Sequence, residues 1–194
     1  MVTPRVAAAI IAGGEARRLG GRDKSRLLVE GRPIIVRQVD VLQRVASEVF
    51  IVAPDPSRFA DLGLPVRPDV VPGLGTLGGI HTALETTDAD LVLVVACDLP
   101  FLHEGVLARL TTLAAGHDGA WVRTPRGAEP LLACYTRRAL GPIRDRIAAR
   151  ALKAADLGGV LRMAELGPDE LGVFGPIDRL LTNINTPEDY ARVQ

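Results

Sequence analysis

Short apolar runs alternate along the chain with longer stretches of helical periodicity. Residues 6–11, 49–52 and 91–96 are continuous apolar runs, each closed by glycine, proline or acidic residues. Runs of this length and composition are typical of strands buried on both faces of a sheet. Further extended segments are predicted at 66–69, 120–122 and 130–135.

Helical spacing of apolar residues begins after Pro33, which suits the first turn of a helix. Comparable patterns predict further helices at 75–84, 106–113, 137–150 and 187–193. Strands that alternate with helices indicate βαβ units and a mostly parallel sheet. No repeat or linker divides the 194 residues, so we expect a single domain over residues 1–194.

In a parallel sheet of this kind, ligands bind beyond the carboxyl ends of the strands. We therefore expect the loops that follow Ile11, Val52, Asp69 and Ala96 to meet at one crevice. This expectation identifies the segments in which functional side chains should be sought.

The composition excludes several classes of function. The 23 basic residues are balanced by 23 acidic ones, and one Trp and two Tyr cannot form a stacking surface for nucleic acid. The run 6–11 is too short for a secretion signal or a membrane span. Cys97 and Cys134 lack the spacing of a metal site. We expect a cytoplasmic protein that binds neither membranes nor nucleic acid.

A glycine-rich loop, residues 13–24, follows the first predicted strand. Its glycines leave backbone N–H groups open to phosphate oxygens, and Lys24 adds a compact positive charge. The sequence matches neither the P-loop nor the dinucleotide pattern GxGxxG. A solvated surface loop is the alternative, but the position after a buried strand favours a binding role. This pattern predicts that the loop binds the phosphates of a nucleotide.

Two aspartates follow predicted strands. Asp98 comes directly after the run 91–96, and a carboxylate there could hold Mg²⁺ together with phosphate oxygens. A turn or helix-cap role is the alternative for Asp98. For Asp69, next to Pro68, a turn role and a nucleotide contact are equally favoured.

Later motifs add less specific indications. The segment 73–79 can place a helix N-terminus toward an anion, or simply pack a helix closely against the sheet. His81 receives no functional assignment. Asn183 and Asn185 would point the same way in an extended segment, although a cap on the last helix is the alternative. Thr186 is better suited to that cap.

Taken together, these motifs resemble the molybdenum-cofactor guanylyltransferases, the MobA family within the MobA-like NTP transferase superfamily. The resemblance spans nearly the whole chain and rests on Ile11-Ala-Gly-Gly14, Arg17-Arg-Leu-Gly-Gly21, Asp23-Lys24, Gly75-Thr-Leu-Gly-Gly-Ile80, Cys97-Asp-Leu-Pro100, Glu129-Pro130 and Asn183-Ile-Asn-Thr-Pro-Glu188. It implies a Rossmann-like three-layer α/β/α nucleotidyltransferase fold with a mostly parallel mixed sheet.

The resemblance also implies roles for single residues. Lys24 would contact the phosphates and Asp98 would hold Mg²⁺, so both would be catalytic, while Asp69 would lie near the nucleotide. Asn183 and Asn185 would lie near the acceptor or the metal. The expected nucleotide contacts from the first strand and its turn are Ile11, Ala12, Gly13 and Gly14.

The implied reaction transfers GMP from GTP to molybdenum-bound molybdopterin and releases pyrophosphate, with molybdenum-cofactor assembly proteins as partners. Two departures from the family pattern are Thr76, where proline is usual, and Ala53-Pro54, where an asparagine often reads guanine. The second departure leaves room for CTP as the nucleotide or for another phosphorylated acceptor. A nucleotide-binding regulator without catalysis is the alternative from another class.

Overall fold

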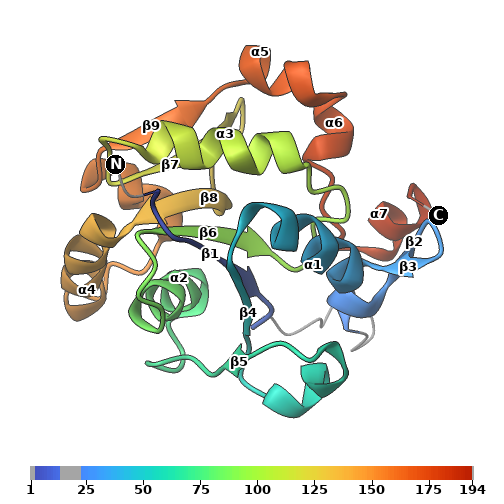
Figure 1. Cartoon of the computed structure of the whole chain (residues 1–194), viewed down its shortest axis with the longest axis horizontal. Coiled ribbons are helices and arrows are strands. Elements are labelled where there is room, and N and C mark those ends of the chain that lie inside the picture. Colours follow the sequence, from blue (N-terminus) through green and yellow to red (C-terminus); the bar gives the residue numbers. More distant parts are fainter. Residues whose placement is uncertain (1–2, 14–22, 194) are drawn as a thin grey trace.

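The structure is a computed structural model, and it describes residues 3–13 and 23–193 of the chain. A seven-stranded sheet forms its centre (Figure 1). In spatial order the strands are β5 (Val66–Arg67), β4 (Glu48–Val52), β1 (Val6–Ile11), β6 (Leu91–Ala96), β8 (Gly127–Thr136), β7 (Gly119–Thr124) and β9 (Met163–Leu166). β8 is antiparallel to its two neighbours, and the other pairings are parallel. The mostly parallel mixed sheet that the sequence predicts is confirmed.

The register of the parallel strands aligns their carboxyl ends. Ile11 at the end of β1 pairs with Val52 of β4 on one side and with Ala96 of β6 on the other. Val52 in turn pairs with Arg67 of β5. Four strands therefore end at the same edge, and the loops that follow them start side by side.

Helices cover both faces of this sheet. They are α1 (Ile34–Val45), α2 (Gly75–Glu85), α3 (Glu104–Ala114), α4 (Leu140–Ala148), α5 (Pro168–Leu171), α6 (Ile177–Leu180) and α7 (Pro187–Ala191). Ala8 and Ile10 of β1 pack in a core with α1 and α3, whereas Ala7 and Ala9 pack in a core with α2 and α4. Figure 1 shows these two helical layers on opposite sides of the strands. The alternation along β1 explains why its apolar run is continuous.

Several short elements were not expected from the apolar pattern. They are the hairpin β2 (Leu28–Val29) and β3 (Arg32–Pro33), the edge strand β9, the short helices α5 and α6, and 3₁₀ turns at Lys24–Arg26, Pro56–Leu62, Arg137–Ala139, Ala154–Gly159 and Gly172–Phe174. Among the described residues, no helix is long and apolar enough to cross a bilayer.

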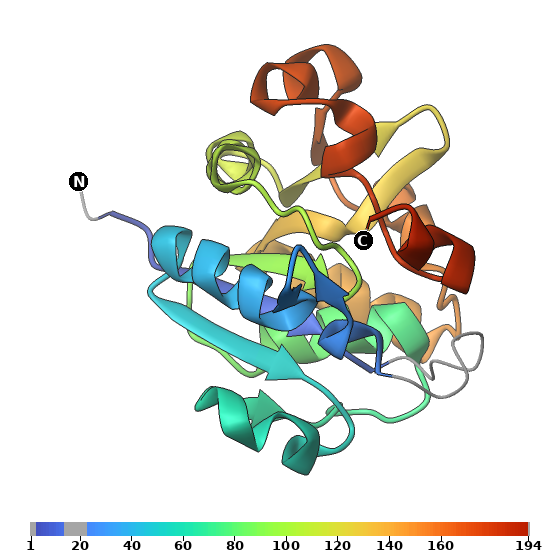
Figure 2. The same cartoon turned by 90° about the vertical axis from the view of Figure 1, so that its right-hand side faces the viewer.

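The end of the chain returns to its beginning. Ile184 is fully buried in a small apolar cluster with Leu27, Val29 and Ile34. Figures 1 and 2 show α7 beside the β2–β3 hairpin. Thr186 caps α7 through a capping box with Asp189, which confirms the cap expected at this residue. The cluster places the C-terminal segment next to the carboxyl edge of the sheet.

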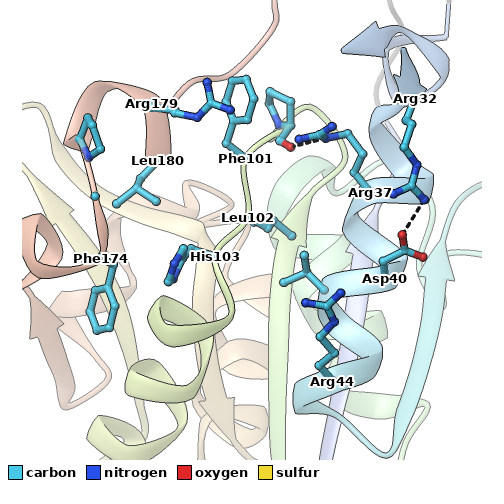
Figure 3. Close-up of a pocket in the computed structure, with 14 residues that line it drawn as sticks. Arg32, Arg37, Asp40, Arg44, Phe101, Leu102, His103, Phe174, Arg179 and Leu180 are labelled. Atoms are coloured by element: carbon cyan, nitrogen blue, oxygen red, sulfur yellow. Dashed lines mark hydrogen bonds and ion pairs between the residues drawn. The ribbon is translucent and has the colours of Figure 1, made fainter. Parts of the chain in front are cut away.

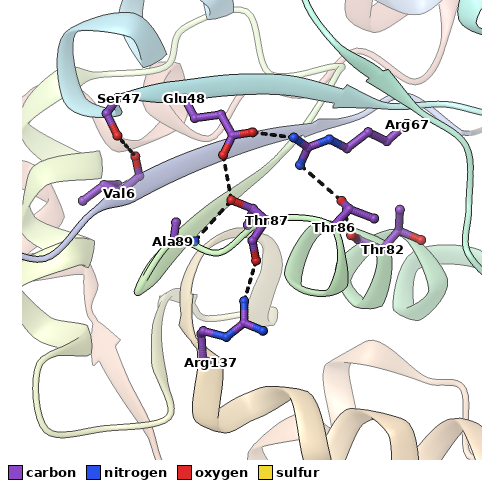
Figure 4. Close-up of polar contacts among 9 residues, drawn as sticks. All are labelled: Val6, Ser47, Glu48, Arg67, Thr82, Thr86, Thr87, Ala89 and Arg137. Atoms are coloured by element: carbon purple, nitrogen blue, oxygen red, sulfur yellow. Dashed lines mark hydrogen bonds and ion pairs between the residues drawn. The ribbon is translucent and has the colours of Figure 1, made fainter.

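A polar network fixes the short strand β5. Glu48 of β4 forms an ion pair with Arg67 of β5 and accepts a hydrogen bond from Thr87 Oγ1 at 2.7 Å (Figure 4). Arg67 also donates to Thr86 Oγ1 at 3.2 Å, and Arg137 donates to the Thr87 carbonyl. β5 has only two residues, so these bonds to β4 and to the end of α2 hold it in the sheet.

The contact between α2 and β1 is close enough to require glycine. A Cβ atom on Gly79 would lie 2.8 Å from Ile11 Cγ2, whereas a Cβ on Gly141 of α4 would meet no atom within 4 Å. α2 can therefore approach the sheet only because position 79 has no side chain.

Replacing these two glycines should have opposite effects on stability. We expect Gly79→Ala to lower the free energy of unfolding by about 1–3 kcal/mol through overpacking against Ile11. The control Gly141→Ala should raise it by roughly 0.4–1 kcal/mol, because alanine restricts the unfolded chain without a clash. Urea unfolding of both variants measures the difference. A Gly79→Ala protein as stable as the wild type would contradict the close packing.

His81 is buried between α2 and α4, where it is 6% exposed. Its Nε2 lies 3.6 Å from Glu85, which also pairs with Arg144 of α4 at 2.6 Å. Burial lowers the pKa of His81 below its usual value of 6.5, although the charge of Glu85 opposes this effect. The side chain thus belongs to the packing between helices, and no functional role is assigned to it.

The buried histidine predicts a pH dependence of stability. The unfolded chain takes up a proton at this residue near pH 6.5, and the folded protein does so only at lower pH. The free energy of unfolding should therefore fall as the pH decreases below 6.5. Urea unfolding at about pH 7.5 and about pH 5.5 should show a smaller difference for His81→Gln than for the wild type. Equal pH dependence in both proteins would exclude His81 as the cause.

Candidate functional site

A cleft lies at the carboxyl edge of the sheet, where the loops after β1, β4, β5 and β6 meet. Its volume is about 460 Å³. The lining residues include Ile11, Ala12, Gly13, Lys24, Val52, Asp69, Gly75, Gly79, Ala96 and Asp98. The expectation that these four loops share one crevice is confirmed. Of the expected nucleotide contacts, Gly14 lies outside the described residues, as does the rest of the loop to residue 22.

Lys24 begins a 3₁₀ turn, Lys24–Arg26, that aims its side chain at this cleft. The ammonium Nζ donates to Asn185 Oδ1 at 2.5 Å and lies 3.8 Å from Asp98 Oδ2. Only 22% of the lysine side chain is exposed. The structure thus joins three residues that the sequence places far apart.

Asp23 fixes the turn that carries Lys24. Its carboxylate accepts hydrogen bonds from the Ser25 backbone N–H at 3.0 Å and the Ser25 hydroxyl at 2.6 Å. Arg58, which also lines the cleft, pairs with the same carboxylate at 2.7 Å. The hydrogen bonds and the Arg58 charge lower the pKa of Asp23, outweighing the opposing effect of burial. Asp23 is part of the loop motif, but Arg58 carries no sequence signal.

Asp98 follows β6 directly and faces Lys24. Burial raises the pKa of its carboxyl group, and the Lys24 charge works in the opposite direction. The loop is held at the backbone, because Cys97 N donates to Ile11 O at 3.2 Å and Ile184 N donates to Asp98 O at 3.1 Å. Only 17% of the Asp98 side chain is exposed.

The donor set at Asp98 fits a hard divalent cation. Mg²⁺ binds proteins through one or two carboxylates and completes its octahedron with water and substrate phosphates. Within residues 3–13 and 23–193, no three His, Cys, Asp or Glu side chains gather as a metal site. Asp98 is thus a carboxylate of the kind that can hold such an ion together with the oxygens of a bound triphosphate.

Asp69 lines the same cleft as Lys24 and lies beyond the end of β5. A Cβ atom on Gly13 would lie 4.0 Å from Asp69 Oδ2, which places this carboxylate beside the turn after β1. Thr82 Oγ1 of α2 contacts Asp69 Oδ1 at 3.5 Å and accepts the Val70 N–H at 3.0 Å. Burial raises the pKa of Asp69 despite the contact with Thr82. Asp69 therefore lines the cleft while its carboxylate contacts α2.

The glycine-rich segment before α2 lies at the cleft as well. Gly73, Gly75, Thr76 and Gly79 all line it, and Gly75 has a left-handed φ of 58°. The N-terminal turn of α2 therefore faces the cleft with unpaired backbone N–H groups, where the helix dipole favours an anion. The close packing of Gly79 on Ile11 is present too, so both readings of this motif apply.

The paired asparagines lie in different environments. Asn185 is bonded to Lys24, whereas Asn183 is exposed and forms no hydrogen bond with the described residues. The chain turns into the cap of α7 here, since the Asn185 N–H donates to Asp189 Oδ2 at 3.0 Å. Of the two asparagines, the structure therefore brings only Asn185 into contact with Lys24.

Glu129 lies close enough to Asp98 to feel its charge, although the sequence motif predicts no role for it. It belongs to β8, which starts near the carboxyl edge because it runs antiparallel to β6. Burial raises the pKa of its carboxyl group, and the nearby Asp98 charge raises it further, while Arg126 lowers it. The Glu129-Pro130 motif draws attention to this residue, but the sequence does not indicate that it lies near Asp98.

A second pocket, of about 390 Å³, lies on the other side of the loop after β6 (Figure 3). Its arginines are Arg32, Arg37, Arg44 and Arg179. Each has a carboxylate partner within 4 Å, among Asp40, Glu30 and Glu104. The positive charge is thus largely balanced, and none of the expected site residues lines this pocket.

Comparison with known proteins agrees with the cleft geometry. Residues 8–164 match the MobA-like NTP transferase domain. A "probable molybdenum cofactor guanylyltransferase" of Chloroflexus aggregans is 35% identical over 95% of this chain and 91% of its own length. The molybdenum cofactor guanylyltransferase of Rhodobacter capsulatus is 35% identical over 98% of this chain and 95% of its own length.

A solved structure supports the same conclusion. The molybdopterin-guanine dinucleotide biosynthesis protein A of Archaeoglobus fulgidus superposes with a TM-score of 0.81 at 26% identity, over 96% of both chains. The Rossmann-like nucleotidyltransferase fold and the family resemblance expected from the sequence motifs are confirmed. The chain belongs to the family of proteins with a MobA-like NTP transferase domain.

Proposed function

We propose that this protein transfers GMP from GTP to the phosphate of molybdenum-bound molybdopterin and releases pyrophosphate. The observation that carries the proposal is the approach of Lys24 to Asp98, 3.8 Å apart in a cleft of nucleotide size. Relatives that match nearly the full chain are named for this reaction. Nucleotidyltransferases of the family typically use a divalent metal, and we propose Mg²⁺ for this one.

The described residues suggest where GTP would bind. The turn Ile11-Ala12-Gly13 and Asp69, which line the cleft, would contact base and ribose. The N-terminal turn of α2 would face the phosphates with its free N–H groups. Lys24 and Asp98, which line the cleft as well, would lie next to the triphosphate. Gly14 belongs to the same proposed contacts.

The reaction then needs only alignment and charge stabilisation. An oxygen of the acceptor phosphate attacks the α-phosphorus of GTP, and the bond from that phosphorus to the bridging oxygen of pyrophosphate breaks. Lys24 would exchange its bond with Asn185 for the phosphate oxygens and stabilise the charge that develops on the leaving pyrophosphate. Mg²⁺, when bound, supplies further charge neutralisation between the phosphates. Asp98 would hold and orient that ion through its carboxylate.

Other features complete the proposal. Asn185 lies at the Lys24 ammonium, so we assign it to the acceptor side of the cleft. The exposed Asn183 could meet the acceptor only at the rim. We also propose a location in the cytoplasm and contact with molybdenum-cofactor assembly proteins, which would deliver the acceptor or receive the product.

A cytidylyltransferase is the second candidate, because Ala53-Pro54 follows β4 where an asparagine often reads guanine. The carboxylate of Asp69 favours GTP, since guanine presents adjacent N–H donors on one edge and cytosine lacks that pair. Backbone groups of the first turn add donors and acceptors that need no asparagine.

The two lysines of the chain provide a matched test of catalysis. We expect Lys24→Met to lower kcat by about 10²–10³, because a charge that acts in the transition state is lost. The control Lys153→Met should leave kcat unchanged, since Lys153 is 74% exposed and pairs with Asp156 on the surface. Pyrophosphate release with GTP, Mg²⁺ and molybdopterin measures both. Undiminished activity of Lys24→Met would remove this lysine from the mechanism.

Nucleotide preference separates the two candidate reactions. We expect GTP to displace a fluorescent GTP analogue from the protein at concentrations at least about tenfold below those needed for CTP or ATP, with Mg²⁺ present. Asp69→Asn should reduce this preference. A carboxylate can accept one hydrogen bond from guanine on each of its two oxygens, whereas an amide has only one oxygen and presents an NH₂ donor in place of the other. Tighter binding of CTP would support the cytidylyltransferase and retain the fold and the phosphate contacts. Nucleotide binding without pyrophosphate release would indicate a regulator.

A further inference from the structure

A buried glutamine of α1 forms hydrogen bonds with the loop that carries Asp98. Gln38 has no exposed surface. Its amide nitrogen donates to the Ala96 carbonyl at 2.8 Å and to the Leu99 carbonyl at 2.9 Å. These two carbonyls flank Cys97 and Asp98, so one side chain fixes both ends of the segment that carries the proposed metal ligand.

The orientation of the Gln38 carboxamide follows from its partners. Only the NH₂ end can face two carbonyl oxygens, and both of its protons are used. The other end, Oε1, is buried and has no hydrogen-bond partner in the described part of the chain. A buried polar atom without a partner destabilises the fold. An apolar side chain of similar size would remove this unpartnered oxygen but would also take the two donors away from the Ala96 and Leu99 carbonyls, so the glutamine is explained by the loop it holds.

The other restraints on this loop act on its backbone from different directions. Ile11 O of β1 accepts the Cys97 N–H, and the N–H of Ile184 donates to the Asp98 carbonyl. Neither contact reaches the Leu99 side of the loop, where Gln38 donates to the Leu99 carbonyl and Arg37, also of α1, donates to the Pro100 carbonyl at 3.2 Å. Among the described residues, Gln38 is the side chain that bonds the backbone on both sides of Cys97 and Asp98.

We propose that Gln38 is a positioning residue, which holds the Asp98 carboxylate at the place where it faces Lys24. This inference rests on the proposed role of Asp98 as the metal ligand. Groups that orient a metal ligand through a second layer of hydrogen bonds affect metal affinity and activity without touching the ion. Displacement of a catalytic group by about 1 Å can lower the rate by about 10²-fold.

The test is Gln38→Met, which keeps the length of the side chain and removes both donors. The affinity of the GTP complex for Mn²⁺, measured from the relaxation rate of water protons, reports on the metal site without requiring turnover. We expect Mn²⁺ affinity and kcat each to fall about 10- to 100-fold, with KM for GTP changed less than about threefold. Gln38→Asn, which is too short to reach both carbonyls, should act in the same direction and gives the answer if the methionine variant does not fold.

Two control variants of the same helix separate positioning from stability. Leu42→Val removes apolar volume from a fully buried residue whose side chain cannot form hydrogen bonds with the loop, and Gln43→Met changes an exposed residue. Both should retain wild-type Mn²⁺ affinity and kcat, even where Leu42→Val lowers the unfolding midpoint as much as Gln38→Met. If Gln38→Met and Gln38→Asn also keep wild-type Mn²⁺ affinity and kcat, the inference is overturned.

Asp98→Asn distinguishes this inference from the proposed function. Wild-type Mn²⁺ affinity in Asp98→Asn would show that the metal role of Asp98 itself is wrong. Loss of Mn²⁺ binding in Asp98→Asn, with normal binding in both Gln38 variants, would overturn only the positioning role. Loss of Mn²⁺ binding in Asp98→Asn, together with weakened binding in the Gln38 variants, supports both the metal role of Asp98 and the positioning role of Gln38.

Discussion

The contact between the Lys24 ammonium and the Asp98 carboxylate depends on the order of the strands. Lys24 follows the loop after β1, and Asp98 follows β6, so the two residues meet because β1 and β6 are adjacent and end at the same level. Asn185 reaches the same point from the other end of the chain. With a different strand order, Lys24, Asp98 and Asn185 would not contact one another, and the cleft would lose the pairing of the ammonium with the carboxylate.

Burial makes this arrangement both costly and useful. A carboxylate that leaves water without a partner loses much of its solvation, which is why burial raises the pKa of Asp98. The nearby Lys24 offsets part of that cost, and Asn185 satisfies a proton of the ammonium. The same groups would act strongly on phosphates, because electrostatic interactions weaken less in a shielded cleft than in bulk water. The contacts among Lys24, Asn185 and Asp98 thus stabilise the site, and the phosphates of a nucleotide would replace them.

The sequence predicted the parts of the fold that depend on one periodic pattern. The strands at 6–11 and 91–96 and the helix after Pro33 agree with the structure because long apolar patterns determine them. The β2–β3 hairpin was missed because its strands have two residues each, and β9 because Met163–Leu166 includes an exposed acidic residue and no apolar run. Short elements of this kind are fixed by their neighbours in space, which a single sequence does not reveal.

The site shows the same division. Asp69 and Asp98 stand close behind strand ends, Lys24 closes the glycine-rich loop, and all three were found from that placement and the family motifs. The supports, Arg58 on Asp23 and Gln38 beneath the Asp98 loop, could not be found, since their role depends on side-chain contacts between distant segments.

A crystal structure of the protein with GTP and Mn²⁺ tests the central claim most directly, because anomalous scattering locates the metal. The account predicts Mn²⁺ bound by the Asp98 carboxylate and by triphosphate oxygens, with Lys24 Nζ moved from Asn185 to the phosphates. A metal bound without Asp98, or GTP bound outside the cleft with the Lys24–Asn185 contact intact, would contradict it.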